Sequence, residues 1–235
     1  MKPKVLAVVP ARAGSKRLPQ KNIKLLNGKP LIAYTFDAIK KSKYITATIA
    51  TSDCTEVLKI SERYKNTYPL KRPKDLASDT ASSIDVLLHA VKFAEEQGSF
   101  DIVCLLQPTS PLRTAADIDN AIELYIKNNA KGVVSMTKCE HSPLWATPLE
   151  ADSDFKIFIK SLSVARSQDL KTFYQLNGAV YLIDKTALLN EGKLFLESDY
   201  YPFIMSSENS IDIDNALDFK LAELILEGKT VASNS

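Results

Sequence analysis

The sequence predicts an α/β fold in which helices cover both faces of a mostly parallel sheet. Short apolar runs rich in β-branched residues alternate with segments whose apolar residues recur every three or four positions. A strand, a helix and a further strand in that order are typical of parallel crossover connections. With 235 residues, 45% of them hydrophobic, the chain is long enough for one such domain with a small appendage.

Five apolar runs predict strands, and the periodic segments predict helices. The strands are expected at residues 5–9, 45–51, 102–106, 132–136 and 179–183. The helices are expected at residues 30–41, 55–64, 82–96 and 117–128, with a last helix at 216–227. Pro30 suits a first helical position because its missing N–H would have no partner there. Either Asp117 or Thr114 can cap the helix that begins near residue 117.

Residues 138–171 interrupt this alternation. They contain Trp145, the one tryptophan of the chain, and an alternation of apolar and polar residues at 155–159. This pattern predicts an inserted hairpin with one apolar face, for which a second subunit is a candidate partner. We expect a single domain over residues 1–229 and a frayed tail at 230–235.

Composition excludes several classes of protein. A net charge of +2, with the basic residues clustered at one loop, gives no indication of nucleic-acid binding. No apolar run approaches the roughly 18–20 residues that span a bilayer, and the N-terminal run is too short for a signal peptide. We therefore expect a cytoplasmic protein without membrane contact. The three cysteines form no CxxC pair, and neither histidine has partners at metal-ligand spacing.

The loop at residues 10–22, which follows the first predicted strand, is the strongest indication of function. The chain has eight Lys or Arg and no acidic residue before Asp37. The loop has neither the Walker A nor the GxGxxG pattern. Even so, Gly14 allows a close approach of the backbone to a phosphate, and Ser15 can donate a hydrogen bond to it. The cations that can offset the charge of a triphosphate are Arg12, Lys16 and Lys21. The alternative is a solvated basic loop.

Asp212 and Asp214 form a second candidate site. If they end a strand, both side chains point to the same side, because side chains alternate along a strand. Two carboxylates on one side favour a cation between them, and Mg²⁺ commonly combines one or two carboxylates with phosphate oxygens. The alternative is that Asp214 caps the helix that follows.

The segment 105–113 is a third candidate. It leaves a predicted strand and carries polar side chains to the carboxyl edge of the sheet, where open α/β sheets bind ligands. These side chains belong to Gln107, Thr109, Ser110 and Arg113. The alternative is a turn stiffened by its two prolines. Arg72 and the Asn177-Gly178 pair are weaker indications by themselves.

Five ordered motifs, taken together, resemble the bacterial acylneuraminate cytidylyltransferases (CMP-sialic acid synthetases). They are Ala-Arg-Ala-Gly-Ser-Lys…Lys-Asn (11–22), Lys-Arg-Pro…Leu-Ala-Ser-Asp-Thr-Ala-Ser-Ser (71–83), Leu-Gln-Pro-Thr-Ser-Pro-Leu-Arg (106–113), Asn-Gly-Ala-Val-Tyr (177–181) and Ser-Ile-Asp-Ile-Asp (210–214). The likeness extends from residue 5 to about residue 226. It implies a Rossmann-like, three-layer nucleotidyltransferase fold, a homodimer in which 138–171 is the dimerisation insert, and CTP with Mg²⁺.

The resemblance also implies a role for each motif residue. The triphosphate would be held by Arg12, Ser15 and Lys16, with Lys21 beside them. Cytosine and ribose would be contacted by Asn22, Arg72 and Ser83. The acidic sugar would be held by Gln107, Tyr181 and Arg166, the last of them either in its own subunit or across the dimer. Mg²⁺ would be held by Asp212 and Asp214, whereas Arg17 is expected to face solvent.

The expected reaction is transfer of CMP from CTP to N-acetylneuraminate, a nine-carbon acidic sugar, with release of pyrophosphate. Many members have Arg-Arg-Gln-Asp where this chain has Arg-Ser-Gln-Asp at 166–169, and residues 16–19 are also similar to the enzymes that activate the eight-carbon acid Kdo. The alternatives within the enzyme class are legionaminic and pseudaminic acid. A non-catalytic nucleotide-sugar-binding protein is the alternative outside it. The sequence does not identify a general base.

Overall fold

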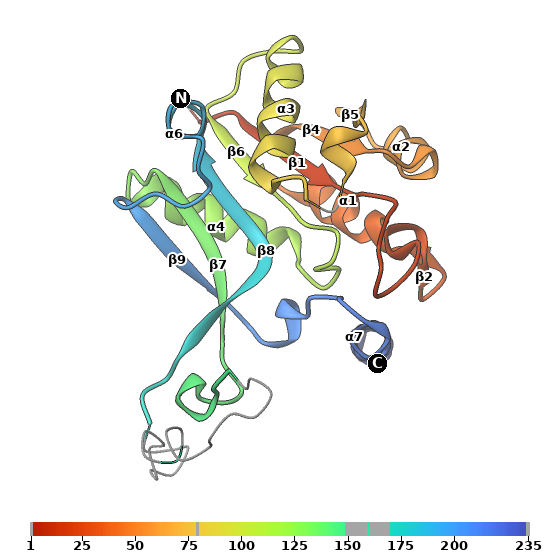
Figure 1. Cartoon of the computed structure of the whole chain (residues 1–235), viewed down its shortest axis with the longest axis vertical. Coiled ribbons are helices and arrows are strands. Elements are labelled where there is room, and N and C mark those ends of the chain that lie inside the picture. The colour runs from red at the N-terminus through yellow and green to blue at the C-terminus, as the bar shows by residue number, and fades with distance from the viewer. Residues whose placement is uncertain (1, 79, 149–158, 160–169, 234–235) are drawn as a thin grey trace.

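A seven-stranded sheet forms the centre of the molecule (Figure 1). The computed structural model describes residues 2–78, 80–148, 159 and 170–233. The strands of the sheet lie in the order β5-β4-β1-β6-β8-β7-β9. Their bounds are β1 Val5–Pro10, β4 Ile45–Ser52, β5 Thr67–Lys71, β6 Ile102–Leu105, β7 Gly132–Lys138, β8 Tyr174–Asp184 and β9 Tyr200–Met205. A separate two-stranded ribbon pairs β2 (Leu25–Leu26) with β3 (Lys29–Pro30).

Helices cover both faces of this sheet, as the sequence predicts. The helices in the described part of the chain include α1 Leu31–Lys41, α2 Thr55–Ser61, α3 Ser83–Glu95, α4 Ala115–Lys127, α6 Lys185–Glu191 and α7 Ala216–Ser233. Alternate residues of β1 enter two separate cores. Val5, Ala7 and Val9 pack with α1, α2 and α4, whereas Leu6 and Val8 pack with α3 on the other face. The predicted α/β class with a layer on each side is confirmed.

The sheet is mostly parallel. β1 pairs in parallel with β4 and β6, and β4–β5 and β7–β9 are also parallel. β8 is the exception, because it runs antiparallel to both β6 and β7. Residues 139–173, only part of which the structure describes, connect β7 to β8. These two strands extend beyond the rest of the sheet, with Lys138 paired to Tyr174.

Most predicted elements are confirmed with small shifts at their ends. Thr114, rather than Asp117, is the N-cap of α4, and the Asp117 side chain accepts a hydrogen bond from the Thr114 backbone to complete a capping box. Pro30 precedes α1 instead of opening it. Strands β5 and β9 and helix α6 were not predicted. Each of these two strands contains a proline (Pro69 and Pro202) and lies at an edge of the sheet, where a missing N–H is tolerated.

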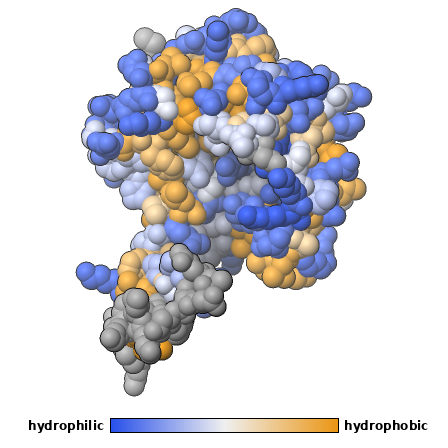
Figure 2. All heavy atoms as spheres, viewed as in Figure 1, coloured by the Kyte–Doolittle hydropathy of each residue, from blue (hydrophilic) through white to orange (hydrophobic). Residues whose placement is uncertain are grey.

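The last helix, α7, lies near the carboxyl edge of β1. One side packs Phe219 and Ala222 against Leu26, Leu31 and Ile213. Another side exposes leucines at 217, 221 and 224, and Figure 2 shows hydrophobic side chains over this helix. The expected end at residue 227 is wrong. The helix continues to Ser233, because the residues after Gly228 include no proline that would end it. The predicted frayed tail at 230–235 is therefore helical up to that residue.

The predicted insert lies only partly within the described residues. A short 3₁₀ helix spans Pro143–Trp145, and the alternation expected at 155–159 lies, apart from Ile159, outside the described part of the chain. No helix in the part that is described has both the length and the apolar character needed to cross a membrane.

Candidate active site

The loop after β1 is fixed at its start by the end of the neighbouring strand β4. The Ala11 backbone N–H donates to Thr51 O at 3.0 Å, and that of Ala13 donates to the Asp53 carboxylate at 2.8 Å. Further along, the side-chain amide of Asn22 donates to Arg12 O at 3.0 Å and closes the loop on itself. The loop that the sequence predicts as a phosphate site is therefore held by hydrogen bonds at both ends.

The acidic segment lies against the far end of this loop. Residues 211–214 belong to no strand or helix, so the strand end considered for Asp212 and Asp214 is not formed. The segment is held instead by two hydrogen bonds, both made by the backbone of Ile213. The Ile213 N–H donates to Thr109 O at 2.8 Å, and Lys21 Nζ donates to Ile213 O at 2.5 Å. Both aspartates nevertheless line the same cavity.

Asp214 is not the cap of α7. Asn215 fills that position, since its side chain accepts hydrogen bonds from the N–H groups of Leu217 and Asp218. The Asp214 carboxylate instead faces two cations. Arg17 Nη1 lies 2.9 Å from one oxygen, and Lys21 Nζ lies 3.6 Å from the other. Arg17 is 71% exposed, as expected of a solvent-facing residue, but its ion pair with Asp214 was not predicted.

The first cavity, of about 590 Å³, lies between the loop and the acidic segment. It collects predicted residues from four distant parts of the sequence. Its lining includes Arg12, Ser15, Lys16, Lys21, Asn22, Arg72, Ser83, Gln107, Asp212 and Asp214. Burial raises the pKa of Asp212, and the charge of Asp214 adds to the rise, while the hydrogen bond to Thr109 and the charge of Lys21 oppose it.

A second cavity, of about 310 Å³, opens from the first toward α3 and shares Arg12, Arg72, Ser83 and Gln107 with it. Arg72 is 6% exposed and donates from Nη2 to Thr51 O at 2.9 Å. Burial lowers the pKa of its guanidinium, the charge of Asp53 opposes this shift, and Arg12 adds to it. The second cavity therefore combines two arginines with apolar lining residues, among them Leu76, Val86 and Leu105.

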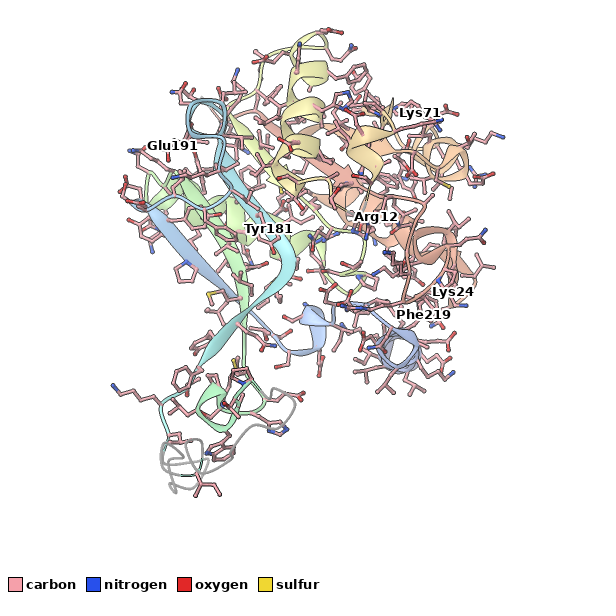
Figure 3. All side chains as sticks on the ribbon, viewed as in Figure 1. Arg12, Lys24, Lys71, Tyr181, Glu191 and Phe219 are labelled. Atoms are coloured by element: carbon pink, nitrogen blue, oxygen red, sulfur yellow. The ribbon has the colours of Figure 1, made fainter. Side chains whose placement is uncertain are left out.

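A third cavity, of about 540 Å³, lies beside β8 and shares Ser83 and Gln107 with the first. Tyr181 lines it together with Leu176, Leu194 and Phe195. Burial raises the pKa of the Tyr181 phenol, and the charge of Asp212 raises it further, so the hydroxyl keeps its proton. Figure 3 shows Arg12 and Tyr181 on opposite sides of the central part of the molecule. Arg12 lines the first cavity and Tyr181 the third, and these two cavities share Ser83 and Gln107.

Asn177 and Gly178 bring β8 close to the acidic segment. The buried Asn177 amide donates to Ser210 Oγ at 2.9 Å and accepts from Ser135 Oγ at 2.6 Å. Gly178 has φ +73°, and a Cβ atom there would lie 2.8 Å from Gln107 Oε1 and 3.5 Å from Asp212 Oδ2. A Cβ atom at this position would force the Gln107 amide to shift, whereas Asp212 would stay at an ordinary contact distance, and the positive φ favours glycine.

Comparison with known proteins agrees with this geometry. The family model described as cytidylyltransferase matches residues 6–206. This chain belongs to the cytidylyltransferase family. Among its relatives is the CMP-N,N'-diacetyllegionaminic acid synthase of Legionella pneumophila, which is 35% identical over 95% of this chain and 97% of its own length. The pseudaminic acid cytidylyltransferase of Campylobacter jejuni is 32% identical over 94% of this chain and 96% of its own.

Other relatives of this cytidylyltransferase differ in length or in sequence. The N-acylneuraminate cytidylyltransferase of Escherichia coli is 35% identical over 97% of this chain, which spans 54% of that longer protein. A solved CMP:2-keto-3-deoxy-manno-octonic acid synthetase in complex with CTP superposes with a TM-score of 0.69 over 96% of this chain and 99% of its own. At 14% identity, that likeness supports the nucleotidyltransferase fold alone.

The cytidylyltransferase departs from the sequence predictions at Arg113. Arg113 does not reach the cavities, because it is buried and donates to Gln107 O, Ala179 O and Thr35 Oγ1. Its role is structural, and burial lowers the pKa of its guanidinium to about 10. Arg166 lies outside the described residues, so its predicted place at the sugar stays a prediction.

Asp53 was missed altogether. It follows β4 in a short polar stretch, Thr-Ser-Asp, that has no distinguishing local pattern. Its position after a predicted parallel strand beside β1 was the available signal, since adjacent carboxyl ends meet at one edge of a sheet.

Proposed function

We propose that this cytidylyltransferase transfers CMP from CTP to a nine-carbon acidic sugar and releases pyrophosphate. One observation carries the proposal. The cations of the loop after β1 and the two aspartates line a single cavity, and the cavities beside Arg72 and Tyr181 both join it at Ser83 and Gln107. A triphosphate, a base and a sugar can therefore lie around one reacting phosphorus.

In this arrangement the triphosphate lies along Arg12, Ser15 and Lys16, and Lys21 offsets charge on the phosphates. The base and ribose lie in the second cavity against Arg72 and Ser83, with Asn22 in the adjoining first cavity. The anomeric hydroxyl of the sugar, approaching from the side of Gln107 and Tyr181, attacks the α-phosphorus, and pyrophosphate leaves. Catalysis then consists of positioning the reactants and stabilising phosphate charge.

The acidic pair fits Mg²⁺. Two carboxylates line the cavity together with the loop cations, and Asp214 already binds cationic groups of the protein itself. Mg²⁺ prefers such a partial set of oxygen ligands and takes the others from phosphate and water. When bound, it would neutralise charge on the triphosphate. Asp212 and Asp214 would hold it.

The relatives from Legionella pneumophila, Campylobacter jejuni and Escherichia coli are named for three different acids, so the sugar is the finer part of the proposal. N-acetylneuraminate is the leading candidate, with legionaminic and pseudaminic acids as alternatives. We also propose that the enzyme is a cytoplasmic homodimer joined through residues 138–171. Exposed apolar side chains at the base of this segment support the dimer, namely Leu144, Trp145, Tyr174 and Leu176. Sedimentation of the wild-type chain tests it, and a monomer at micromolar concentration would contradict it.

The test of function is pyrophosphate release from CTP and Mg²⁺ with each of the three acids in parallel, alongside ATP, GTP and UTP as nucleotide controls. We expect release with CTP and one acid well above the rate without sugar. The competing possibility is a protein that binds the nucleotide sugar without turning it over. Binding of CTP with no pyrophosphate from any acid would favour that possibility.

A further inference from the structure

We propose that Asp53 is a positioning residue, which holds the loop after β1 in the shape that receives the triphosphate. The proposal rests on the proposed function, because it concerns the affinity for CTP. Asp53 is half-buried at the end of β4 and lines a cavity of about 440 Å³ behind the loop, together with Ala13 and Asn22. It is not among the residues that line the first cavity, so it acts through its neighbours.

Asp53 contacts the loop at a turn formed by residues 13–15. The Asp53 carboxylate accepts the N–H of Ala13 at 2.8 Å, and the Ser15 N–H then turns back to Ala13 O at 3.0 Å. Gly14 lies between them, and nothing else lies within 4 Å of where its Cβ would be. The bond to Asp53 ties the turn at 13–15 directly to the end of β4. This turn carries Ser15 and leads directly into Lys16.

Asp53 also joins this turn to the segment that carries Arg72. Lys71 Nζ donates to Asp53 O at 2.6 Å, and the Arg72 N–H donates to the adjacent Ser52 O at 2.8 Å. One short stretch at the end of β4 therefore sets the position of both the loop and Arg72. The spacing between the expected triphosphate and base sites depends on it.

The charge of Asp53 suits this place. The loop brings Arg12 and Lys16 to the site, and no acidic residue precedes Asp37 in the chain. Asp53 approaches the start of the loop from β4, and Asp214 approaches its far end through Arg17 and Lys21. The two carboxylates thus brace a strongly basic loop from both sides. A hydrogen bond from a backbone N–H to a charged carboxylate is stronger than one to a neutral acceptor.

The test compares three variants by steady-state kinetics and thermal unfolding. Asp53→Ala removes the acceptor, whereas Asp53→Asn keeps an oxygen for the Ala13 N–H. Asp101→Ala is the matched control. The Asp101 carboxylate accepts the N–H of Lys4 at 2.8 Å, just before β1 begins, whereas the loop and the cavities lie after β1 ends. All three are measured at saturating sugar with varied CTP.

We expect Asp53→Ala to raise the KM for CTP about tenfold, with a smaller change in kcat, as follows from the loss of one charge-assisted hydrogen bond. Asp53→Asn should recover most of the affinity, and Asp101→Ala should leave the KM within twofold. An unchanged KM in Asp53→Ala, or an equal rise in Asp101→Ala at equal thermal stability, would overturn the proposal. Absence of CTP turnover in the wild type would instead contradict the proposed function, and direct CTP-binding measurements on the same variants would still test Asp53.

Discussion

The guanidinium of Arg17 lies 2.9 Å from the carboxylate of Asp214, although the two residues are 197 positions apart. Both side chains are more than half exposed, so this ion pair contributes little to stability, on the order of 0.2–1 kcal/mol. Its significance lies in its position. It places a cation of the basic loop on one of the two carboxylates proposed to hold Mg²⁺.

Arg17→Gln is expected to lower the Mg²⁺ concentration for half-maximal rate, by about two- to threefold, because it removes a competitor for Asp214. Initial rates over a Mg²⁺ titration, together with Mn²⁺ binding in the absence of CTP, measure the effect. Lys220→Gln is the control, since it breaks another exposed pair, with Glu223 at 2.7 Å, on α7. A higher Mg²⁺ requirement in Arg17→Gln would show that Arg17 assists the metal instead.

Asp212→Asn and Asp214→Asn are each expected to reduce kcat by roughly 100- to 1000-fold while the protein stays folded. The substitution keeps the shape of each side chain but removes the charge that Mg²⁺ requires. Pyrophosphate release gives the rate, and thermal unfolding checks the fold. Glu223→Gln, on the nearby helix α7, serves as the control. Near-normal turnover in both aspartate variants would remove the metal assignment.

Gly178→Ala is expected to reduce activity by more than tenfold, because the added methyl would lie 2.8 Å from Gln107 Oε1. It also places alanine at φ +73°, which by itself costs about 1 kcal/mol. Gly28→Ala separates the two effects. Gly28 has φ +75° with nothing within 4 Å of its Cβ position, so that variant should lose stability alone. Equal kinetics in the two variants would argue against a role for the Gln107 position.

Arg113→Met is expected to destabilise the fold by about 3 kcal/mol, because it leaves two buried acceptors and one partly buried acceptor without their donor. For a chain of this length, the melting temperature should fall by roughly 6–12 °C. Arg63→Met, at an exposed position, should change it little. A melting temperature equal to that of the wild type would return Arg113 to the list of ligand-binding candidates.

The sequence predicted the parts of the fold whose signal is local. The strand at residues 5–9 and helix α3 can be recognised from the spacing of their apolar residues. The β-α-β alternation then predicts parallel strands. The edge strands β5 and β9 were missed because proline and half-burial weaken the strand pattern. The antiparallel direction of β8 depends on how the long segment 139–173 returns to the sheet, which no local spacing encodes.

The site divides in the same way. Arg12, Lys16 and the two aspartates were found because several charges of one sign within a short segment stand out in a sequence. The contacts of Arg17 with Asp214, and of Asp53 with Ala13, were not found because they join residues far apart in the chain. Arg113 was misplaced for a related reason. A sequence shows that an arginine follows a strand. It does not show that three acceptors lie within hydrogen-bond distance of the guanidinium.

We propose that the basic loop at residues 10–22 and the acidic segment at 211–214 form one site for CMP transfer. Mass spectrometry of reactions containing CTP, Mg²⁺ and each of the three nine-carbon acids tests it most directly, with wild type and Asp214→Asn compared. We expect a CMP-linked sugar, equimolar with pyrophosphate, from the wild type and almost none from the variant. No CMP-linked product with any of the acids, or equal yields from both proteins, would contradict it.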